Sequence, residues 1–496
     1  MKEKSIELTI PSQPKISVNS SRLFRREIFS VIRNYHQETL SQPTNLLTIP
    51  TKSRAEDQHD VVFKQQLSFN GIAKRDIASL GKTQGQLIIL GSGWAGFKLL
   101  KDLSTKHYEV TVISPRNYFV FTPLLASSSV GTLEFRCITE PIRRYSPKIK
   151  YYQAYADTID LKKQVIHCTS NIEHKKHEFS IDYDKLIIAV GAKSNTFGIK
   201  GVDEHAFFLK DISDARKIRS RVIECFEHAS QPDVTKKEAT DLLHFVVVGG
   251  GPTGIEFSGE LYDFITEDMA RLYPGLINLV TMTVYDVAPQ ILGSFDASLR
   301  DFATKKFKRK GINICTNRHV MEVKEREIII EEEGSIPYGM LVWSTGLTEN
   351  PLIHSMSDQL IKDKSAKRLL TDEYLRVLSK ETGQALDNVY ALGDCASIEN
   401  YDLPATAQVA NQKAKYLSKA LSKIAPEKES ITGTEPFKFR NFGSMAYIGK
   451  YTAVVDMTPV SEKAKEGGIL AWLFWRSSYF TMTVSLRNKM LIPMYW

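Results

Sequence analysis

Two apolar stretches, each followed by a glycine-rich turn and then by a helical pattern, stand out in the distribution of hydrophobic and polar residues. The residues at 87–90 precede the turn Gly91-Ser-Gly-Trp-Ala-Gly96, and those at 245–248 precede the turn Gly249-Gly-Gly-Pro-Thr-Gly254. A short uninterrupted apolar run beside such a turn predicts a strand that is buried on both faces. The chain therefore predicts two strand–turn–helix units far apart in the sequence.

Both turns have the spacing G-x-G-x-x-G. In dinucleotide-binding folds the first glycine permits the tight turn, the second lets the backbone approach a pyrophosphate, and the third lets helix and strand pack closely. The phosphates then lie at the positive N-terminus of the helix. One match is weak evidence, because glycine turns also close ordinary α/β units, but two in the same context favour an α/β protein that holds a flavin and a nicotinamide.

Further apolar stretches predict how the two units are connected. Strands that end at Gly191 and Gly346 are typical of segments that return the chain between two nucleotide domains, so the pair indicates a second domain inserted into the first. The stretch 389–392 leads into Gly393-Asp394. Asp394 can accept a hydrogen bond from a flavin ribityl hydroxyl, and a helix cap is the alternative use of the same residue type.

The residue that follows the second strand of each unit bears on nucleotide choice. The strand at 280–285 ends at Asp286, and an acid there can bind ribose hydroxyls and repel a 2′-phosphate. This favours NADH over NADPH, with a turn aspartate as the alternative. The first unit has Ser114 and Arg116 instead. A serine can still bind a ribose, and an arginine can lie near a pyrophosphate or stack on adenine, unless Arg116 is only a surface charge.

Composition and charge narrow the function classes. The net charge of +8 comes without an aromatic-rich basic motif, so nucleotide phosphates or an anionic membrane surface explain it better than nucleic acid does. The five cysteines form no Cys-x-x-Cys pair, which indicates reduced intracellular thiols and argues against a disulfide reductase. No metal site is expected. The sequence has no apolar stretch of 18 residues, so membrane contact is expected from one side only.

The C-terminal segment from Gly467 to Ile492 is apolar and aromatic, with three basic residues and no acid. Leu473, Phe480 and Val484, with Trp472 and Trp475 alongside, can share an apolar face, while the basic residues Arg476, Arg487 and Lys489 suit anionic headgroups. This pattern predicts a peripheral membrane contact. Packing on the protein's own core or in a homodimer interface is the alternative, and a dimer can present two such segments to one membrane.

In combination, these motifs resemble the type II (alternative) NADH:quinone oxidoreductases, the single-chain, non-pumping enzymes of fungal and plant mitochondria and of bacteria. The motifs that carry the resemblance, in order, are 89–96, 113–125, 189–192 with 195–198, 249–257, 393–396 and 407–412. The resemblance covers roughly residues 85–496. It implies FAD at the first turn, NADH at the second, a ubiquinone-type acceptor, and a peripheral location on the mitochondrial inner membrane, with a homodimer as the expected assembly.

Carried over to this chain, the resemblance and the motifs give the following expected site residues. Those for FAD are Gly91, Ser92, Gly93, Trp94, Ala95, Gly96, Ser114, Arg116, Thr122, Pro123, Leu124, Gly191 and Asp394. Those for NADH are Gly249, Gly250, Gly251, Pro252, Thr253, Gly254, Glu256, Asp286 and Gly346, and those for the quinone are Gln408, Asn411 and Gln412. No nucleophile is expected, because flavin N5 accepts the hydride itself, and Glu256 is the one side chain expected near the nicotinamide.

The expected domains follow from the same patterns. They are a disordered arm or targeting segment at 1–83, an FAD-binding domain in two parts at 84–239 and 356–430, an inserted NADH-binding domain at 240–355, and a C-terminal membrane-anchoring or dimerisation region at 431–496. Within the arm, residues 20–33 can form an amphipathic helix with four arginines, as in mitochondrial transit segments; a solvated helix in a disordered arm is the alternative.

Three departures from the family pattern are visible. Asn411 stands where some mitochondrial members carry a histidine, the N-terminal arm matches no motif, and a further basic, apolar stretch is expected beyond Trp496. Two rival functions are weighed against the quinone oxidoreductase. One is a soluble NADH-dependent reductase such as a ferredoxin reductase, and the other is a flavin-loaded binding protein in the manner of apoptosis-inducing factors.

Overall fold

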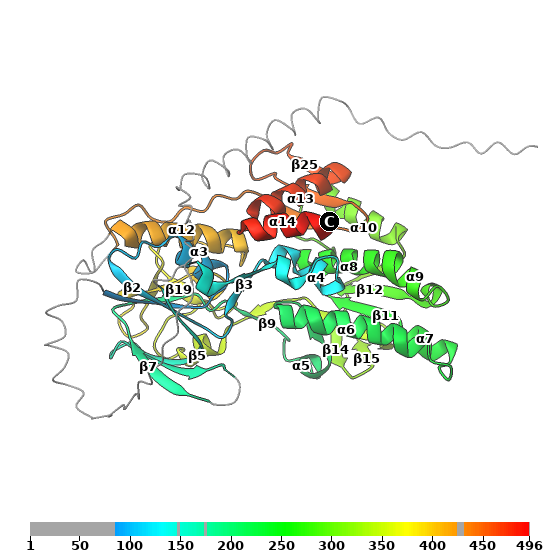
Figure 1. Ribbon diagram of the computed structural model, residues 1–496, viewed down its shortest axis with the longest axis horizontal. Coiled ribbons are helices and arrows are strands. Elements are labelled where there is room, and N and C mark those ends of the chain that lie inside the picture. Colours follow the sequence, from blue (N-terminus) through cyan, green and yellow to red (C-terminus); the bar gives the residue numbers. More distant parts are fainter. Residues whose placement is uncertain (1–84, 146–148, 173–175, 424–430, 496) are drawn as a thin grey trace, which may run out of the picture.

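The computed structural model describes residues 85–145, 149–172, 176–423 and 431–495. The predicted N-terminal arm, with its amphipathic helix at 20–33, lies outside these residues. Two large sheets carry the two glycine turns (Figure 1). The predicted α/β fold with two strand–turn–helix units is confirmed.

The first sheet has ten strands, and its centre is parallel. The strand order is β22 (Ala396–Ile398), β19 (Leu369–Thr371), β20 (Arg376–Leu378), β21 (Ala385–Ala391), β8 (Lys185–Ile188), β1 (Gly85–Leu90), β2 (Tyr108–Ser114), β5 (Lys150–Asp160), β6 (Val165–Ser170) and β7 (Glu178–Asp182). Both sides of β1 are parallel pairings, with β2 and with β8. The first glycine turn follows β1 directly and leads into helix α3 (Trp94–Asp102).

The apolar run of β1 is continuous because the strand has a core on each face. Leu87 and Ile89 point into one hydrophobic cluster and Ile88 and Leu90 into another. On one face, α3 lies beside α12 (Ala407–Lys423) (Figure 1). The opposite face is covered partly by the short helix α11 (Pro351–Ser355), which packs against β5.

The second sheet has five parallel strands in the order β10 (Phe207–Phe208), β17 (Met340–Trp343), β11 (His244–Val248), β12 (Thr281–Asp286) and β13 (Ile312–Thr316). The second glycine turn joins β11 to α8 (Pro252–Phe264), whose first residue is a proline. Proline suits that position because the first backbone N–H of a helix has no partner within the helix. The strand β10 comes from the chain ahead of residue 240, so this sheet draws on more of the sequence than the expected insert.

Helices α6 (Ile212–Ala229), α7 (Lys236–Leu242) and α10 (Ala297–Arg309) complete this unit. Asp211 and Asp214 form a capping box at the start of α6, and Thr235 and Glu238 form one at the start of α7. Such reciprocal bonds satisfy the free N–H groups of a helix start. A three-stranded sheet, β14 (Val320–Val323), β15 (Glu327–Ile330) and β16 (Gly334–Pro337), covers the other face of the parallel sheet through a third cluster.

The remaining elements join these units. Strands β3 (Tyr118–Val120) and β4 (Thr139–Pro141) form an antiparallel pair. Helix α4 (Leu125–Val130) lies between them in the chain and packs against α6 and α8. The C-terminal part consists of an antiparallel sheet and two helices: β23 (Ser444–Tyr447), β24 (Ala453–Asp456), β25 (Lys465–Gly468), α13 (Ile469–Met482) and α14 (Leu486–Tyr495). Short helical pieces at Val202–His205 (α5) and Ala270–Leu272 (α9) complete the described α-helices.

Helices α13 and α14 lie together at one edge of the molecule, above α8 and α4 (Figure 1). The side chain of Trp475 in α13 is 3% exposed and packs on Tyr447, and Ile492 in α14 is fully buried. The expected alternative of packing on the protein's own core is therefore realised for one face of these helices. Among the described residues, no helix has the length and apolar character needed to cross a bilayer.

Candidate active site

The first glycine of each turn has a backbone conformation that other residues avoid. Gly91 has φ +107°, and a β-carbon there would lie 2.3 Å from the carbonyl oxygen of Ala189. Gly249 has φ +116°, and its β-carbon would lie 2.4 Å from the carbonyl oxygen of Ser344. In each case the atom that forbids a side chain belongs to the neighbouring parallel strand or its end, so the turn can form this close to the sheet only with glycine.

The third glycine brings helix and turn into contact. A β-carbon on Gly96 would lie 2.0 Å from the carbonyl oxygen of Gly91, and one on Gly254 would lie 2.0 Å from that of Gly249. The second glycine of each turn behaves differently: a β-carbon on Gly93 or on Gly251 meets no protein atom within 4 Å. The open space lies in front of the N-termini of α3 and α8, where a pyrophosphate fits. The two turns thus have the same geometry position by position, and the dinucleotide-binding roles of their residues stay predictions.

The side chains around the first turn are tied together. The indole N–H of Trp94 donates to Oγ1 of Thr122 over 2.9 Å, which joins the turn to the loop with Pro123 and Leu124. The hydroxyls of Ser92 and Ser114 are buried and lie 2.8 Å apart. The guanidinium of Arg116 is paired with Asp211, the cap of α6, at 2.7 Å. The binding roles expected for Ser114 and Arg116 stay predictions, because their polar groups already have protein partners.

Asp394 lies where β21 ends, near the return strand that closes on Gly191. Burial raises the pKa of the Asp394 carboxyl, and the cations Lys210, Arg368 and Lys413 oppose that rise. Of these cations, Lys210 donates to the carbonyl oxygen of Ala192 over 2.8 Å. The cations favour the ionised form, which accepts a hydrogen bond from a hydroxyl, but burial has the larger effect on the pKa.

Asp286 lies at the end of β12, beside the second turn. Its carboxylate accepts hydrogen bonds from the backbone N–H of Gly250, at 2.5 Å, and from that of Ala288, at 2.7 Å. The acid therefore braces the turn itself. The remaining capacity of its two oxygens is available to ribose hydroxyls, as expected for an adenosine-binding acid.

The two return segments lie side by side. β9 (Lys193–Ser194) pairs with β18 (Leu347–Thr348), and the N–H of Asn195 donates to the carbonyl oxygen of Gly346 over 3.3 Å. Gly346 has φ +65°, and a β-carbon there would lie 2.6 Å from the ring of Phe197. The paired glycine turns predicted from the sequence are thus adjacent in space, at the junction between the two sheets.

Glu256 lies on α8 and contacts the C-terminal part. Its Oε1 accepts from the N–H of Tyr447 and from the indole N–H of Trp475, both over 3.2 Å. Burial raises the pKa of Glu256 to about 8. The sequence did not reveal this contact, and the expected proximity of Glu256 to the nicotinamide stays a prediction.

The side chains expected at the quinone also bind the protein. At the start of α12, Gln408 accepts from the N–H of Phe442 over 2.9 Å and donates to the carbonyl of Gly443 over 3.3 Å. Gln412 exchanges two hydrogen bonds with the backbone of Arg440, at 2.8 and 3.0 Å. The side chain of Asn411 makes no hydrogen bond within the described residues. The amides therefore fasten the loop segment that leads into the C-terminal part, and a quinone role remains a prediction.

A buried acid that sequence reasoning missed links the two nucleotide units. Oε1 of Glu260, one helical turn after Glu256, accepts from the hydroxyl of Ser127 over 2.6 Å, and Oε2 accepts from that of Thr132 over 3.1 Å. Its side chain is 6% exposed, and burial raises its pKa to about 7. The helical spacing of four from Glu256 was the available signal for a shared face.

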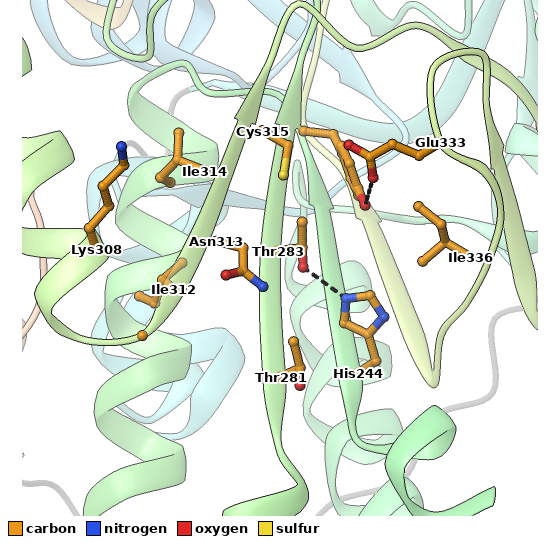
Figure 2. Close-up of a pocket in the computed structure, with 12 residues that line it drawn as sticks. His244, Thr281, Thr283, Lys308, Ile312, Asn313, Ile314, Cys315, Glu333 and Ile336 are labelled. Carbon is orange, nitrogen blue, oxygen red and sulfur yellow. Dashed lines mark hydrogen bonds between the residues drawn. The ribbon is translucent and has the colours of Figure 1, made fainter. Parts of the chain in front are cut away.

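A groove of about 480 Å³ lies elsewhere, between the edge of the parallel sheet and the three-stranded sheet (Figure 2). In its lining, His244 on β11 hydrogen-bonds with Thr283 on the neighbouring β12, and Tyr285 donates to Glu333. Cys315 on the edge strand β13 faces the same groove. No predicted site residue lines it. At the surface near β14, the ligand atoms of His319, Glu331 and Glu332 lie within 4.8 Å of one another, and His319 is already bonded to Glu332 at 2.6 Å.

The free face of the two C-terminal helices is apolar. We call it the C-terminal apolar patch, and it consists of Leu470, Leu473, Leu486, Met490 and Met494, which are 42 to 78% exposed. The basic residues of these two helices differ in what they contact. Arg476 lies over the ring of Trp472, whereas Arg487 donates to the carbonyl of Thr139 over 2.7 Å. Trp475, expected on the exposed face, is buried because its indole reaches Glu256.

Comparisons with known proteins agree with this arrangement. The family model described as pyridine nucleotide-disulphide oxidoreductase matches residues 85–414, and the NDH2 C-terminal domain model matches 442–496. A probable NADH dehydrogenase of Dictyostelium discoideum is 44% identical over 414 residues, which cover 83% of this chain and 88% of that protein. The internal alternative NAD(P)H-ubiquinone oxidoreductase A1, mitochondrial, of Solanum tuberosum is 40% identical, over 88% of this chain and 90% of the relative.

Among solved structures, NDH2 from Plasmodium falciparum in complex with NADH has the same fold, with a TM-score of 0.77. It is 30% identical, and the match covers 83% of this chain and 97% of that one. The sulfide:quinone oxidoreductase of Aquifex aeolicus matches with a TM-score of 0.61 at 19% identity, which shows a shared fold alone.

Proposed function

Because this chain belongs to the type II NADH dehydrogenases (NDH2) among the pyridine nucleotide-disulphide oxidoreductases, it is an alternative NAD(P)H-ubiquinone oxidoreductase, and we propose that it transfers two electrons from NADH through bound FAD to a ubiquinone-type quinone at a membrane surface, without pumping protons. The observation that carries the two-nucleotide part is the pair of matched turns. Their second glycines face open space at a helix N-terminus while the first and third are fixed by contact.

FAD fits the first turn and NADH the second. When bound, FAD supplies a flavin ring that accepts a hydride and passes the electron pair on. On the FAD side, the backbone at Gly93 leaves room for the pyrophosphate, Asp394 accepts from a ribityl hydroxyl, and the loop with Thr122, Pro123 and Leu124 flanks the ring system. The carboxylate of Asp286 binds the adenosine ribose of NADH and repels a 2′-phosphate.

The quinone approaches between α12 and the C-terminal part. Support comes from the position of Gln408 and Gln412, which fasten the chain at 440–443 where it enters the NDH2 C-terminal domain. Asn411, on the same helical turn, has its side-chain amide free of hydrogen bonds to the described residues and is the polar group offered to the quinone ring. No side chain has to act as a nucleophile.

The membrane-facing surface is the C-terminal apolar patch. Exposed leucines and methionines next to a tryptophan and basic side chains suit the interface of a bilayer. Since the relatives include internal and external mitochondrial enzymes, we place the protein as a peripheral protein of the mitochondrial inner membrane. We also propose a homodimer, in which two copies present their patches to one membrane.

The function is tested with the purified full chain and liposomes that contain a long-tail quinone. Extracted flavin should be FAD at about one per chain, and NADH should be oxidised with reduction of quinone in the liposomes. Turnover with soluble acceptors but none with membrane quinone would point to a ferredoxin-reductase-like enzyme. A slowly reoxidised flavin complex without turnover would point to a binding protein of the apoptosis-inducing-factor kind.

A further inference from the structure

Lys413 is a fully buried cation in α12. Its side chain is 1% exposed, and it is among the largest side chains in the core. It makes no hydrogen bond or ion pair with any residue in the described ranges. Burial of a charged amine costs free energy unless a partner compensates it. A neutral side chain on this helix face would be less costly, so the charge itself calls for an explanation.

The side chain of Lys413 lines a small cavity together with Asp394. The cavity measures about 10 Å³, and Arg368, Gly393, Thr406 and Val409 also contribute to its wall. Such a volume holds about one water molecule. Lys413 thus lines the same single-water space as Asp394, the acid that the proposed function assigns to the flavin.

The other charged groups near this cavity have partners. Arg368 is paired with Asp363 at 2.7 Å and with Asp402 at 3.3 Å. Burial raises the pKa of the neighbouring Cys395 to about 11, which keeps it a neutral thiol. Asp394 is therefore the acid that lines this cavity with Lys413, and the charges of Lys210 and Arg368 also act on its carboxyl. The surroundings of Asp394 carry more positive than negative charge.

We propose that Lys413 tunes the reduction potential of the bound flavin, by placing a buried positive charge behind Asp394. The inference rests on the proposed function, since it needs FAD at the first turn. A hydride brings two electrons and one proton, so its acceptor gains one unit of negative charge. A cation in a poorly solvated interior lowers the energy of that charge over several ångströms. Lys413 therefore shifts the equilibrium with NADH towards the reduced flavin.

Protonation of Lys413 sets the pH range of this effect. Burial lowers the pKa of Lys413 to about 8, with Arg368 lowering it further and Asp394 opposing the shift. Below pH 8 the amine is charged and acts on the flavin. Above pH 8 the amine is neutral, so the wild-type protein should lose the advantage that the charge provides.

The test compares the midpoint potential of bound flavin in Lys413→Gln and Lys413→Met with that of the wild type, by equilibration with a reference dye at pH 7. Both variants should show a tenfold weaker tendency to accept the electron pair, which is about 30 mV for a two-electron couple. The difference should shrink at pH 9. Lys419→Gln, an exposed lysine of the same helix, is the matched control and should leave the potential unchanged.

Thermal stability separates a tuning role from a structural one. The Lys413 amine is a buried charge without a hydrogen-bonding partner among the described residues, so its removal should leave Tm equal or higher in both variants. A lower midpoint potential of the flavin would then not result from a damaged fold. Potentials equal to that of the Lys419→Gln control would overturn the inference, as would loss of FAD from both variants, which would show that Lys413 only supports binding. Failure of the wild type to hold FAD or to reduce quinone would instead overturn the proposed function.

Discussion

At the residue scale, Gly93 and Gly251 are the two turn glycines at which a side chain would test ligand binding without disturbing the fold. Replacement of Gly91, Gly96, Gly249 or Gly254 would force a side chain into backbone within 2.4 Å and damage the fold. A side chain on Gly93 or Gly251 meets only open space. These two positions therefore report on what occupies that space, and they form a matched pair in equivalent turns.

Gly93→Val should yield folded protein without FAD, because the side chain fills the space of the pyrophosphate. Gly251→Val should keep FAD and raise the KM for NADH at least tenfold. Flavin absorbance of the purified proteins and steady-state kinetics measure the two outcomes. A Gly93→Val protein with full flavin content would contradict the assignment of the first turn.

Asp286→Asn should weaken the preference for NADH over NADPH by roughly tenfold or more, since the negative charge that repels a 2′-phosphate is lost. The amide oxygen still accepts from one backbone N–H of the turn, so Tm should fall only slightly. The ratio of kcat/KM for the two nucleotides measures the effect. An unchanged ratio would place the discrimination on another residue.

At this scale, the sequence reveals a residue's role only where residues near it in the chain determine that role. The tight turn at Gly91 and the close helix packing at Gly96 are readable from the sequence, because they depend on the turn itself. The partners of Gln408 are not readable, because they lie more than thirty positions away in the chain. Lys413 has no local signal at all, since its burial depends on the position of the Asp394 turn relative to α12.

At the element scale, α8 connects the two nucleotide units with the C-terminal part. Its start faces the second glycine turn, Glu256 contacts the C-terminal sheet and α13, and Glu260 contacts the segment around α4. The strand and helix of each glycine unit follow from hydrophobic periodicity. The contribution of β10 to the second sheet does not, because a two-residue strand carries no periodic pattern.

Glu260→Gln should raise the free energy of unfolding at pH 8 by up to roughly 2–3 kcal/mol, the order of magnitude expected for this pKa shift. Glu260 has a pKa of about 7 in the folded protein against 4.5 as its ordinary value. The folded state therefore keeps a proton that the unfolded state releases, and stability falls as pH rises from about 4.5 to about 7. A glutamine accepts from Ser127 without that loss.

Denaturant unfolding at pH 5 and pH 8 measures the effect of this substitution. The variant should match the wild type at pH 5 and exceed it at pH 8. Asp358→Asn, an exposed acid after helix α11, serves as the control and should leave the pH dependence as it is. Equal pH profiles for all three proteins would show that Glu260 is ionised when folded.

At the scale of the whole molecule, the C-terminal helices have two different faces. One is part of the core through Ala471, Trp475 and Ile492, and the other is the C-terminal apolar patch. The sequence predicts that the segment is apolar. It does not predict which face is buried and which is exposed, because hydrophobic residues occur on all sides of both helices. Truncation of this segment would expose core, so substitutions on the free face give the cleaner experiment.

The double variant Leu486→Glu with Met490→Glu should bind liposomes at least tenfold more weakly, because each buried apolar side chain contributes about 1.5–3 kcal/mol. Reduction of long-tail quinone should fall with it, while FAD content and turnover with a short-tail quinone stay normal. Liposome co-sedimentation measures binding. Leu272→Glu, an equally exposed leucine on α9, is the control, and equal binding by both variants would contradict membrane contact through the patch.

The antiparallel pair of β9 and β18 has a consequence for how such a chain can be rebuilt. The polypeptide leaves the ten-stranded sheet and comes back to it through neighbouring strands, with Ser194 opposite Leu347. The two ends of the segment between β9 and β18 are therefore joined by strand pairing and lie next to each other. A segment whose ends are adjacent can be exchanged at little entropic cost of loop closure. A chimaera that carries the corresponding segment of a relative, joined at this ladder, should fold and take its nucleotide preference from the donor.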